Sequence, residues 1–303
     1  MTLRRNILIF QTAALGDFIL TWPLAMALGR IFPQSRVIYI THAQKGTLAE
    51  RVLGVESRDV ERGWHHLYGD ASKLPEDARR LLTGAHSIYS FVANRTDAWS
   101  GQVRALAPDA DLCCLRLTPP PEFPAHATDY LLAQLDDRRA VAEATRQMIQ
   151  SVNQRGIGRF AASGQMIVIQ PGSGSPLKCW PAARFLELAQ RLRHSGRSIR
   201  IVLGEAELER WPAGQIEQFA AVGEVVEPKS YVELLANFAD AGLYIGNDSG
   251  PSHLAGIIGL SSHCLFGPTR PETWRPLGPR VRVLQRIPME SLEVDEVERL
   301  VNE

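Results

Sequence analysis

Short apolar runs alternate with longer stretches of helical periodicity along almost the whole chain. The runs are rich in aliphatic and β-branched residues, which is typical of buried strands. They are Asn6–Phe10, Arg36–Ile40, Ser87–Val92, Asp111–Leu115, Gln165–Gln170, Ser198–Leu203, Glu224–Glu227, Leu243–Gly246, Ser262–Phe266 and Val281–Leu284. The stretches between them predict helices at Asp17–Ile31, Gln44–Leu53, Ser72–Leu82, Asp97–Leu106, Pro181–His194, Glu205–Ala221, Tyr231–Ala239 and Ser252–Gly259. This alternation predicts an α/β protein whose parallel sheets carry helices on both faces.

The alternation falls into two series, which are separated by the polar stretches Arg138–Arg159 and Ala161–Gly164. A chain of 303 residues is long enough for two domains of ordinary size. We therefore predict two Rossmann-like, doubly wound domains, 1–160 and 161–303, that face each other across a cleft. In such sheets ligands bind beyond the carboxyl ends of the strands, so the strand-to-helix loops are the places to search for chemistry.

Charge and composition exclude several classes of protein. Lysine plus arginine number 33 and aspartate plus glutamate also 33, so no basic field favours a nucleic acid as the main partner. Apolar stretches such as Phe18–Leu28 are shorter than the roughly 20 residues of a membrane-spanning helix, and Met1–Arg5 does not lead into a signal peptide. The four cysteines show no metal or disulfide spacing. We expect a soluble protein of a reducing compartment.

The first loop of interest, Gln11–Asp17, follows the first predicted strand directly. Gly16 permits a turn, and Asp17 opens the next predicted helix. Two interpretations of Asp17 are open: a helix N-cap, which the spacing favours, or a general base exposed in the cleft. With one glycine, the loop lacks the G-x-G-x-x-G fingerprint of dinucleotide binding.

The second loop, Pro171–Pro181 (PGSGSPLKCWP), has the composition of a phosphate cradle. Its small residues expose backbone N–H groups, its serines add hydroxyl donors, and Lys178 adds a positive charge. It is not a Walker A loop, because Leu177 and Cys179 stand where that motif requires glycine and serine or threonine. The alternative is a flexible loop with a solvated lysine.

The third loop, Gly246–His253 (GNDSGPSH), joins a buried strand to a helix that begins near Pro251. Proline in the first turn, preceded by serine and aspartate, is a helix start signal. Free N–H groups at a helix N-terminus suit a diphosphate. A lone histidine is more often a packing residue, but the loop residues next to His253 favour a ligand-binding site.

Other motifs favour no site. Asp109–Asp111 has the D-x-D form of some metal-dependent sugar transferases. It leads directly into a predicted strand, so we predict a solvent-exposed start of that strand and no metal site. His65 and His66 are adjacent and lack partners at ligand spacing. The chain contains no G-x-S-x-G nucleophile elbow.

Taken together, the three loops resemble glycosyltransferase family 9, the heptosyltransferases of the lipopolysaccharide inner core. The resemblance spans nearly the whole chain, and each of its blocks follows a strand. The blocks are Gly16-Asp17 with its helix through Leu28, Pro171-Gly172-Ser173 with Lys178-x-Trp180-Pro181, Gly246–Ala255, and Phe266-Gly267-Pro268-Thr269 followed by Trp274 and Pro276. The third block is the most specific.

The resemblance implies a GT-B architecture with an N-terminal acceptor domain and a C-terminal nucleotide-sugar domain. It also implies inverting transfer of heptose from ADP-heptose, without a metal or other cofactor, to a glycolipid or oligosaccharide acceptor. The implied base is Asp17, and Lys178 and Ser173 are implied at the diphosphate. The implied donor-binding residues are further Asp248, Ser249, Gly250 and His253, with Lys229 and Ser230 near the nucleotide base and Glu207, chosen from Glu205, Glu207 and Glu209, at the ribose.

Several questions stay open at this stage. The first 150 residues contain no dense basic cluster for an anionic acceptor, with Arg95 and Arg104 the only candidates, so a different sugar is an alternative. A nucleotide-sugar epimerase of the same fold and a non-catalytic nucleotide-sugar-binding protein are alternative functions. We expect a cytoplasmic location, with peripheral contact to the inner face of the membrane as a further option. The final helix has the option of packing on the N-terminal domain.

Overall fold

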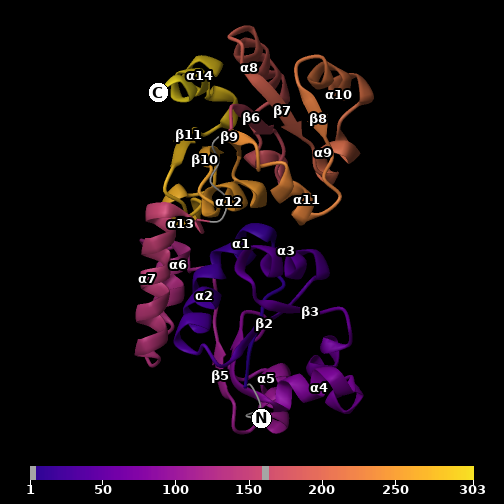
Figure 1. Ribbon diagram of the computed structural model, residues 1–303, viewed down its shortest axis with the longest axis vertical. Helices are drawn as coiled ribbons and strands as arrows, with labels where there is room; N and C mark the ends of the chain where they lie inside the picture. Colours follow the sequence, from indigo (N-terminus) through magenta and orange to yellow (C-terminus); the bar gives the residue numbers. More distant parts are fainter. Residues whose placement is uncertain (1–4, 159–163) are drawn as a thin grey trace. The chain divides into compact units, whose positions relative to one another are not determined.

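The computed structural model describes residues 5–158 and 164–303, and the chain divides into two compact units, Met1–Ile149 and Gln150–Glu303 (Figure 1). Each unit is built on one parallel sheet. The first sheet has the strand order β3-β2-β1-β4-β5 and the second the order β11-β10-β9-β6-β7-β8. The predicted α/β class is therefore confirmed. Of the predicted separator Ala161–Gly164, all but Gly164 lies outside the described residues.

The first unit places its most apolar strand at the centre of its sheet, where both faces are covered. Its strands are β1 (Asn6–Phe10), β2 (Arg36–Thr41), β3 (Glu56–Asp59), β4 (Ala85–Ser90) and β5 (Asp111–Cys114). Its helices are α1 (Leu15–Leu20), α2 (Trp22–Ile31), α3 (Ala43–Leu53), α4 (Glu76–Thr83), α5 (Ala98–Leu106), α6 (Ala127–Ala133) and most of α7 (Arg139–Arg155), with 3-10 turns η1 (Trp64–Tyr68) and η2 (Ala71–Lys73). Every residue of β1 is buried, as a central parallel strand requires.

The second unit repeats the pattern with one more strand. Its strands are β6 (Met166–Gln170), β7 (Ser198–Val202), β8 (Glu224–Val226), β9 (Ala241–Asn247), β10 (Ser261–Phe266) and β11 (Val281–Gln285). Its helices are α8 (Ala182–His194), α9 (Glu205–Arg210), α10 (Ala213–Ala220), α11 (Tyr231–Ala236), α12 (Gly250–Ile257), α13 (Pro271–Trp274) and α14 (Val294–Asn302), with 3-10 turns η3 (Pro176–Lys178) and η4 (Met289–Ser291). Its core packs Trp180 and Phe185 edge to face, with ring centroids 4.8 Å apart.

Three helices that the sequence predicts as continuous are broken in the structure. The predicted helix Ser72–Leu82 is the turn η2 followed by α4, which begins after Pro75. The predicted helix Asp17–Ile31 is two helices that meet at Thr21, because Pro23 lies in the first turn of α2 and supplies no N–H to a preceding turn. The predicted helix Glu205–Ala221 is interrupted at Trp211, which lies before Pro212 and adopts an extended conformation.

The structure contains elements that the sequence did not predict, among them α7, β3 and α6. The stretch Arg138–Arg159, interpreted as a polar separator, forms the 17-residue helix α7 as far as Arg155. The buried side chains of α7 recur at helical spacing, at Val141, Thr145, Ile149 and Val152. The edge strand β3 has the charged sequence ESRD and is half-buried, so it lacks the apolar pattern of a strand. Helix α6 was also missed.

The final helix packs within its own unit. Helix α14 contacts α8, and the two lie side by side at the top of Figure 1. Arg191 of α8 pairs with Asp295 and Glu298 of α14, and Val297 is buried in the core of this unit. The final helix is therefore part of the core of the second unit. No described helix combines the length and the apolar character that crossing a membrane requires.

Candidate active site

Two of the predicted loops converge at the point where the second sheet reverses its strand order. Strands β6 and β9 are neighbours, and Gln170 pairs with Gly246 near their carboxyl ends. The chain proceeds from β6 to β7 on one side, whereas β9 lies on the other. Such a switch point is where doubly wound sheets bind ligands, and it brings Pro171–Pro181 and Asp248–His253 together.

Asn247 joins these two loops from the end of β9. Its side chain is fully buried; its Oδ1 accepts a hydrogen bond from Trp180 N–H at 2.9 Å, and its Nδ2 donates to the Pro171 carbonyl at 2.7 Å. An amide supplies both a donor and an acceptor, so one side chain fixes both ends of the Gly/Ser loop. The sequence analysis did not select Asn247, although a polar residue that ends a buried strand was the available signal.

Ser173, Lys178 and Asp248 form the charged part of the site. Ser173 Oγ donates to the Asp248 carbonyl at 2.9 Å, and Lys178 Nζ donates to Asp248 Oδ2 at 2.8 Å. The side chain of Asp248 is 7% exposed and that of Lys178 is 36% exposed. An ammonium has three N–H donors, so Lys178 keeps donors for a ligand while the buried carboxylate holds it in place.

The serines of the third loop are engaged with the protein itself. Ser249 Oγ donates to Gln170 Oε1 at 3.1 Å, and Ser252 Oγ donates to the Asn247 carbonyl. Helix α12 begins at Gly250 with Pro251 in its first turn, and His253 is buried one turn into it. The side chains thus order the loop, while the first N–H groups of α12 form the kind of helix N-terminus that binds anions.

Glu207 is buried beside the Gly/Ser loop. Its Oε2 accepts a hydrogen bond from Gly204 N–H at 2.8 Å, and a Cβ at Gly172 would overlap the carboxylate, so a larger residue there would displace the Glu207 side chain. Burial raises the pKa of Glu207. Glu205 and Glu209 are exposed instead. The contact of Glu207 with a ribose stays a prediction.

Lys229 and Ser230 are engaged in their own segment. Lys229 Nζ pairs with Glu227 at 3.0 Å, and Lys229 N–H donates to Glu233 Oε2. Ser230 is the N-cap of α11 and accepts from Glu233 N–H at 3.1 Å. Among the described residues, these contacts do not join Lys229 to the group around Asp248.

Asp17 lies in the first unit, at the third residue of α1. The N-cap of α1 is Ala14, so the interpretation of Asp17 as an N-cap is wrong. The side chain is half-buried and lies in the first turn, where a helix favours a negative charge. The base hypothesis therefore no longer competes with a capping role.

Lys45 holds the loop that carries Asp17, and the sequence analysis missed it. It lies in α3, is 6% exposed, and donates to the carbonyls of Thr12, at 2.8 Å, and Ala13. Burial lowers the pKa of Lys45, and the negative charge of Asp17 partly offsets that effect. A lysine in the first turn of a helix that follows the adjacent strand was the available signal.

The motifs set aside in the sequence have structural roles. Asp111 begins β5 and pairs with Arg138, which confirms a strand entry. Cys113 and Cys264 are buried, Cys114 and Cys179 are half-buried, and all four thiols are free. In the described parts of the chain, no three His, Cys, Asp or Glu side chains are grouped as metal ligands.

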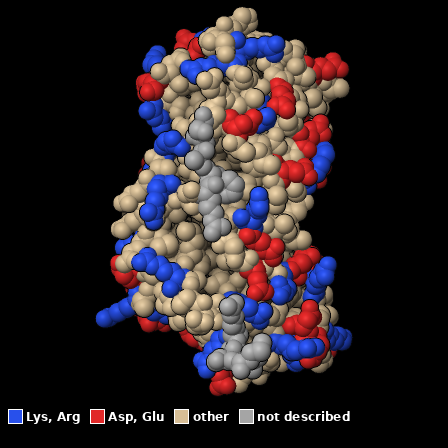
Figure 2. Space-filling model, in the orientation of Figure 1, with Lys and Arg blue, Asp and Glu red and all other residues tan. Residues whose placement is uncertain are grey.

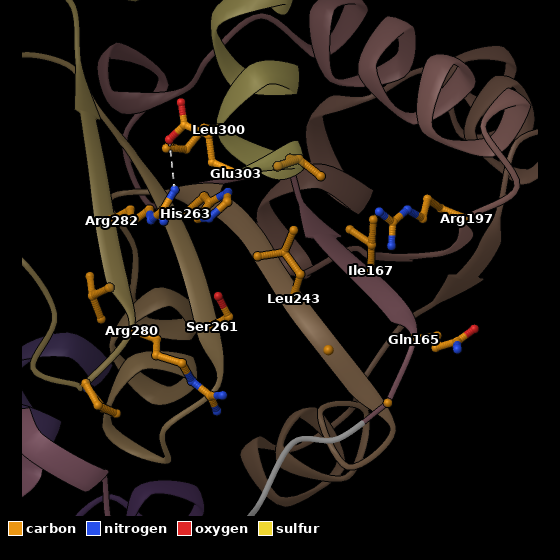
Figure 3. A pocket seen from close by; sticks show the side chains of 15 residues that line it. Gln165, Ile167, Arg197, Leu243, Ser261, His263, Arg280, Arg282, Leu300 and Glu303 are labelled. Atoms are coloured by element: carbon orange, nitrogen blue, oxygen red, sulfur yellow. Dashed lines mark hydrogen bonds and ion pairs between the residues drawn. The ribbon is translucent and has the colours of Figure 1, made fainter.

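A cavity of about 570 Å³ lies at the opposite end of the second sheet from these loops (Figure 3). Residues near the starts of strands line it, among them Ile167, Leu243 and Ser261. Arg282 pairs there with Glu303, and burial next to Arg282 lowers the pKa of His263 to about 4. This cavity is separate from the loop site, because it lies where the strands begin.

Comparison with known proteins gives a consistent result. The family model of glycosyltransferase family 9 (heptosyltransferase) matches residues 122–301, more than half of the chain. Lipopolysaccharide heptosyltransferase 3 of Escherichia coli is 29% identical over 86% of this chain and 83% of its own length. Among solved structures, E. coli ADP-heptose lipopolysaccharide heptosyltransferase II superposes with a TM-score of 0.72 at 18% identity, covering 98% of this chain and 97% of that one. E. coli heptosyltransferase WaaC with ADP gives a TM-score of 0.70 at 18% identity, covering 98% and 99%.

Proposed function

Since the chain belongs to glycosyltransferase family 9, we propose that it transfers heptose from ADP-heptose to a hydroxyl group of a lipopolysaccharide-core acceptor. The chain is a glycosyltransferase by this membership. The name of its E. coli relative supports heptose and lipopolysaccharide, and the ADP in the WaaC structure supports the nucleotide. The proposed transfer inverts the anomeric centre and uses no metal ion or other cofactor.

The proposal divides the chemistry between the two units. In the second, Lys178 and the N-terminus of α12 stabilise the negative charge that grows on the departing ADP. In the first, Asp17 accepts the proton of the acceptor hydroxyl as it attacks the anomeric carbon. Ser249, Gly250 and His253 shape the donor loop, and Glu207 and Lys229 contact the nucleoside. A cytoplasmic location with peripheral membrane contact stays a prediction.

One observation carries the proposal: an accessible ammonium is fixed by a buried carboxylate at the switch point of a doubly wound sheet. Lys178 is held 2.8 Å from Asp248, so its position is set before a ligand arrives. Preorganised charge of this kind is the main source of leaving-group stabilisation, because no reorganisation is needed during the reaction.

The test is the rate of ADP release from ADP-heptose in the presence of a core oligosaccharide. We expect Lys178→Ala to slow turnover by about 100-fold or more, and Lys178→Arg to restore part of the rate, because a planar guanidinium replaces a compact ammonium. Lys73→Ala is the control, since Lys73 forms an exposed pair with Asp70 in the first unit. Activity of Lys178→Ala within twofold of the parent would sink this role.

A further inference from the structure

A second cavity lies at the carboxyl end of the first sheet, on the side where Asp17 is found. Its volume is about 230 Å³. It is lined by residues at or just after the ends of β1 to β4: Phe10, Thr12, His42, Val60 and Val92. Thr12 also belongs to the loop that continues to Asp17, and its carbonyl accepts a hydrogen bond from Lys45. The loop that contributes Thr12 to the cavity therefore also leads to the proposed base.

The floor of the cavity is aromatic and rigid. Phe10 packs edge to face against Trp64, with ring centroids 5.2 Å apart, and against Trp99 at 4.9 Å. All three rings are buried in the core of this unit, whereas Tyr68 is 53% exposed at the mouth. The Tyr68 hydroxyl donates to the Val92 carbonyl at 3.2 Å, which fixes the orientation of its ring. Aromatic walls with a few fixed polar groups are typical of small-molecule sites.

The polar side chains of the cavity include two histidines, His42 and His65, and one carboxylate, Glu61. His42 Nδ1 lies 3.2 Å from Glu61 Oε1 at the rim, where a carboxylate and imidazoles are suited to hydroxyl groups. Among the described residues that line the cavity there is no lysine or arginine. Arg104 donates to the Arg95 carbonyl, and neither residue lines the cavity. Figure 2 shows basic and acidic side chains interspersed on the visible face, without a broad field of one sign.

We propose that this cavity binds an uncharged pyranose ring of the acceptor, with one face of the ring against the aromatic side chains and its hydroxyls toward Glu61 and the histidines. Arginine and lysine are the side chains that most often bind phosphate and carboxylate groups in proteins. The described lining contains neither and includes the carboxylate of Glu61, so it favours a neutral ring. The inference rests on the proposed function, since it assigns the sugar that Asp17 deprotonates.

The experiment is a binding titration of the full chain, without donor, followed by saturation-transfer NMR. The probes are the methyl glycosides of mannose, glucose and galactose, the 6-phosphates of the same glycosides, and the methyl glycoside of a ulosonic acid. We expect at least one neutral glycoside to bind tenfold or more tightly than its phosphate and the ulosonic acid. Equal or tighter binding of the charged probes, or no binding of any neutral glycoside, would overturn the proposal.

Variants at Tyr68 locate the binding. Tyr68→Ala should weaken binding of the neutral glycoside about 5- to 10-fold, and Tyr68→Phe should retain most of it, because the ring supplies the contact. Tyr68→Arg should reverse the preference toward the 6-phosphate. Tyr130→Ala, which removes a tyrosine ring of α6 that does not line the cavity, is the control and should change nothing. An unchanged affinity in Tyr68→Ala would refute the location.

The two proposals fail separately. Glycoside binding needs neither ADP nor Lys178, so a loss of transfer in Lys178→Ala bears on the proposed function alone. Conversely, preference for a charged glycoside would overturn the cavity assignment while leaving the donor site intact.

Discussion

The two units use lysine and aspartate in opposite ways at the carboxyl ends of their sheets. In the first unit the lysine, Lys45, is 6% exposed and is bonded to backbone carbonyls, while Asp17 is half-buried. In the second unit the aspartate, Asp248, is 7% exposed, while Lys178 is 36% exposed. In each unit the more buried charge is engaged with the protein and the other is the more accessible.

This difference in burial shows which charged group each unit presents to a ligand. A buried ionised group is stable only when its bonds are made within the protein, so it serves as an anchor. The accessible partner retains capacity for a substrate. The first unit therefore offers a carboxylate, suited to accept a proton, and the second offers an ammonium, suited to a diphosphate.

Removing the accessible carboxylate should have the largest effect. Asp17→Asn should cost about 10²–10⁴ in turnover, the usual contribution of a positioned base. It should leave the protein folded, because asparagine has nearly the shape of aspartate and Asp17 is not the N-cap of α1. ADP release and urea unfolding measure the two effects. Asp77→Asn, which removes an acid from the first turn of α4, is the matched control. Turnover of Asp17→Asn at the parent rate would exclude the base.

Removing the buried lysine should act on stability instead. Lys45→Met keeps the aliphatic stem but leaves the Thr12 and Ala13 carbonyls without their charged donor, so we expect a loss of about 2–3 kcal/mol in the free energy of unfolding. Lys73→Met is the control, since its exposed pair should contribute less than about 1 kcal/mol. Urea unfolding followed by circular dichroism measures both. Equal losses in the two variants would refute the anchoring role of Lys45.

The smallest effect concerns the other buried carboxylate of the second unit. Burial raises the pKa of Glu207, so folding disfavours its ionised form. The unfolded state therefore releases this proton at lower pH than the folded state, and the parent loses stability relative to Glu207→Gln as the pH rises through the carboxyl range. Unfolding free energies of the two proteins between pH 4 and 7, within the usual carboxyl range and above it, test the sign. A parent that gains stability relative to Glu207→Gln as the pH rises would contradict it.

The sequence predicted the features that depend on local pattern. Buried strands such as Asn6–Phe10, and the loops that follow them, were found because apolar runs and glycines mark them. The strand β3 and the helix α7 were missed because their sequences are largely polar. Their burial depends on tertiary packing, which the local pattern does not show.

The candidate site divides in the same way. The residue types of the second loop pointed to Lys178 and the family resemblance pointed to Asp248, and the structure brings these two together. Their unequal burial, the bridging role of Asn247 and the anchoring of Lys45 depend on contacts between distant segments. No spacing along the chain encodes such contacts, so the sequence could not show which partner of each pair is accessible.

In the proposed function the accessible charge of the second unit, Lys178, binds the nucleotide, and Asp17 of the first unit does not. Calorimetric titration of ADP into the parent, Asp17→Asn and Lys178→Ala tests it most directly. We expect the same dissociation constant for the parent and Asp17→Asn. For Lys178→Ala we expect a dissociation constant at least tenfold higher, which corresponds to about 1.4 kcal/mol. A dissociation constant that rises in Asp17→Asn and stays unchanged in Lys178→Ala would contradict it.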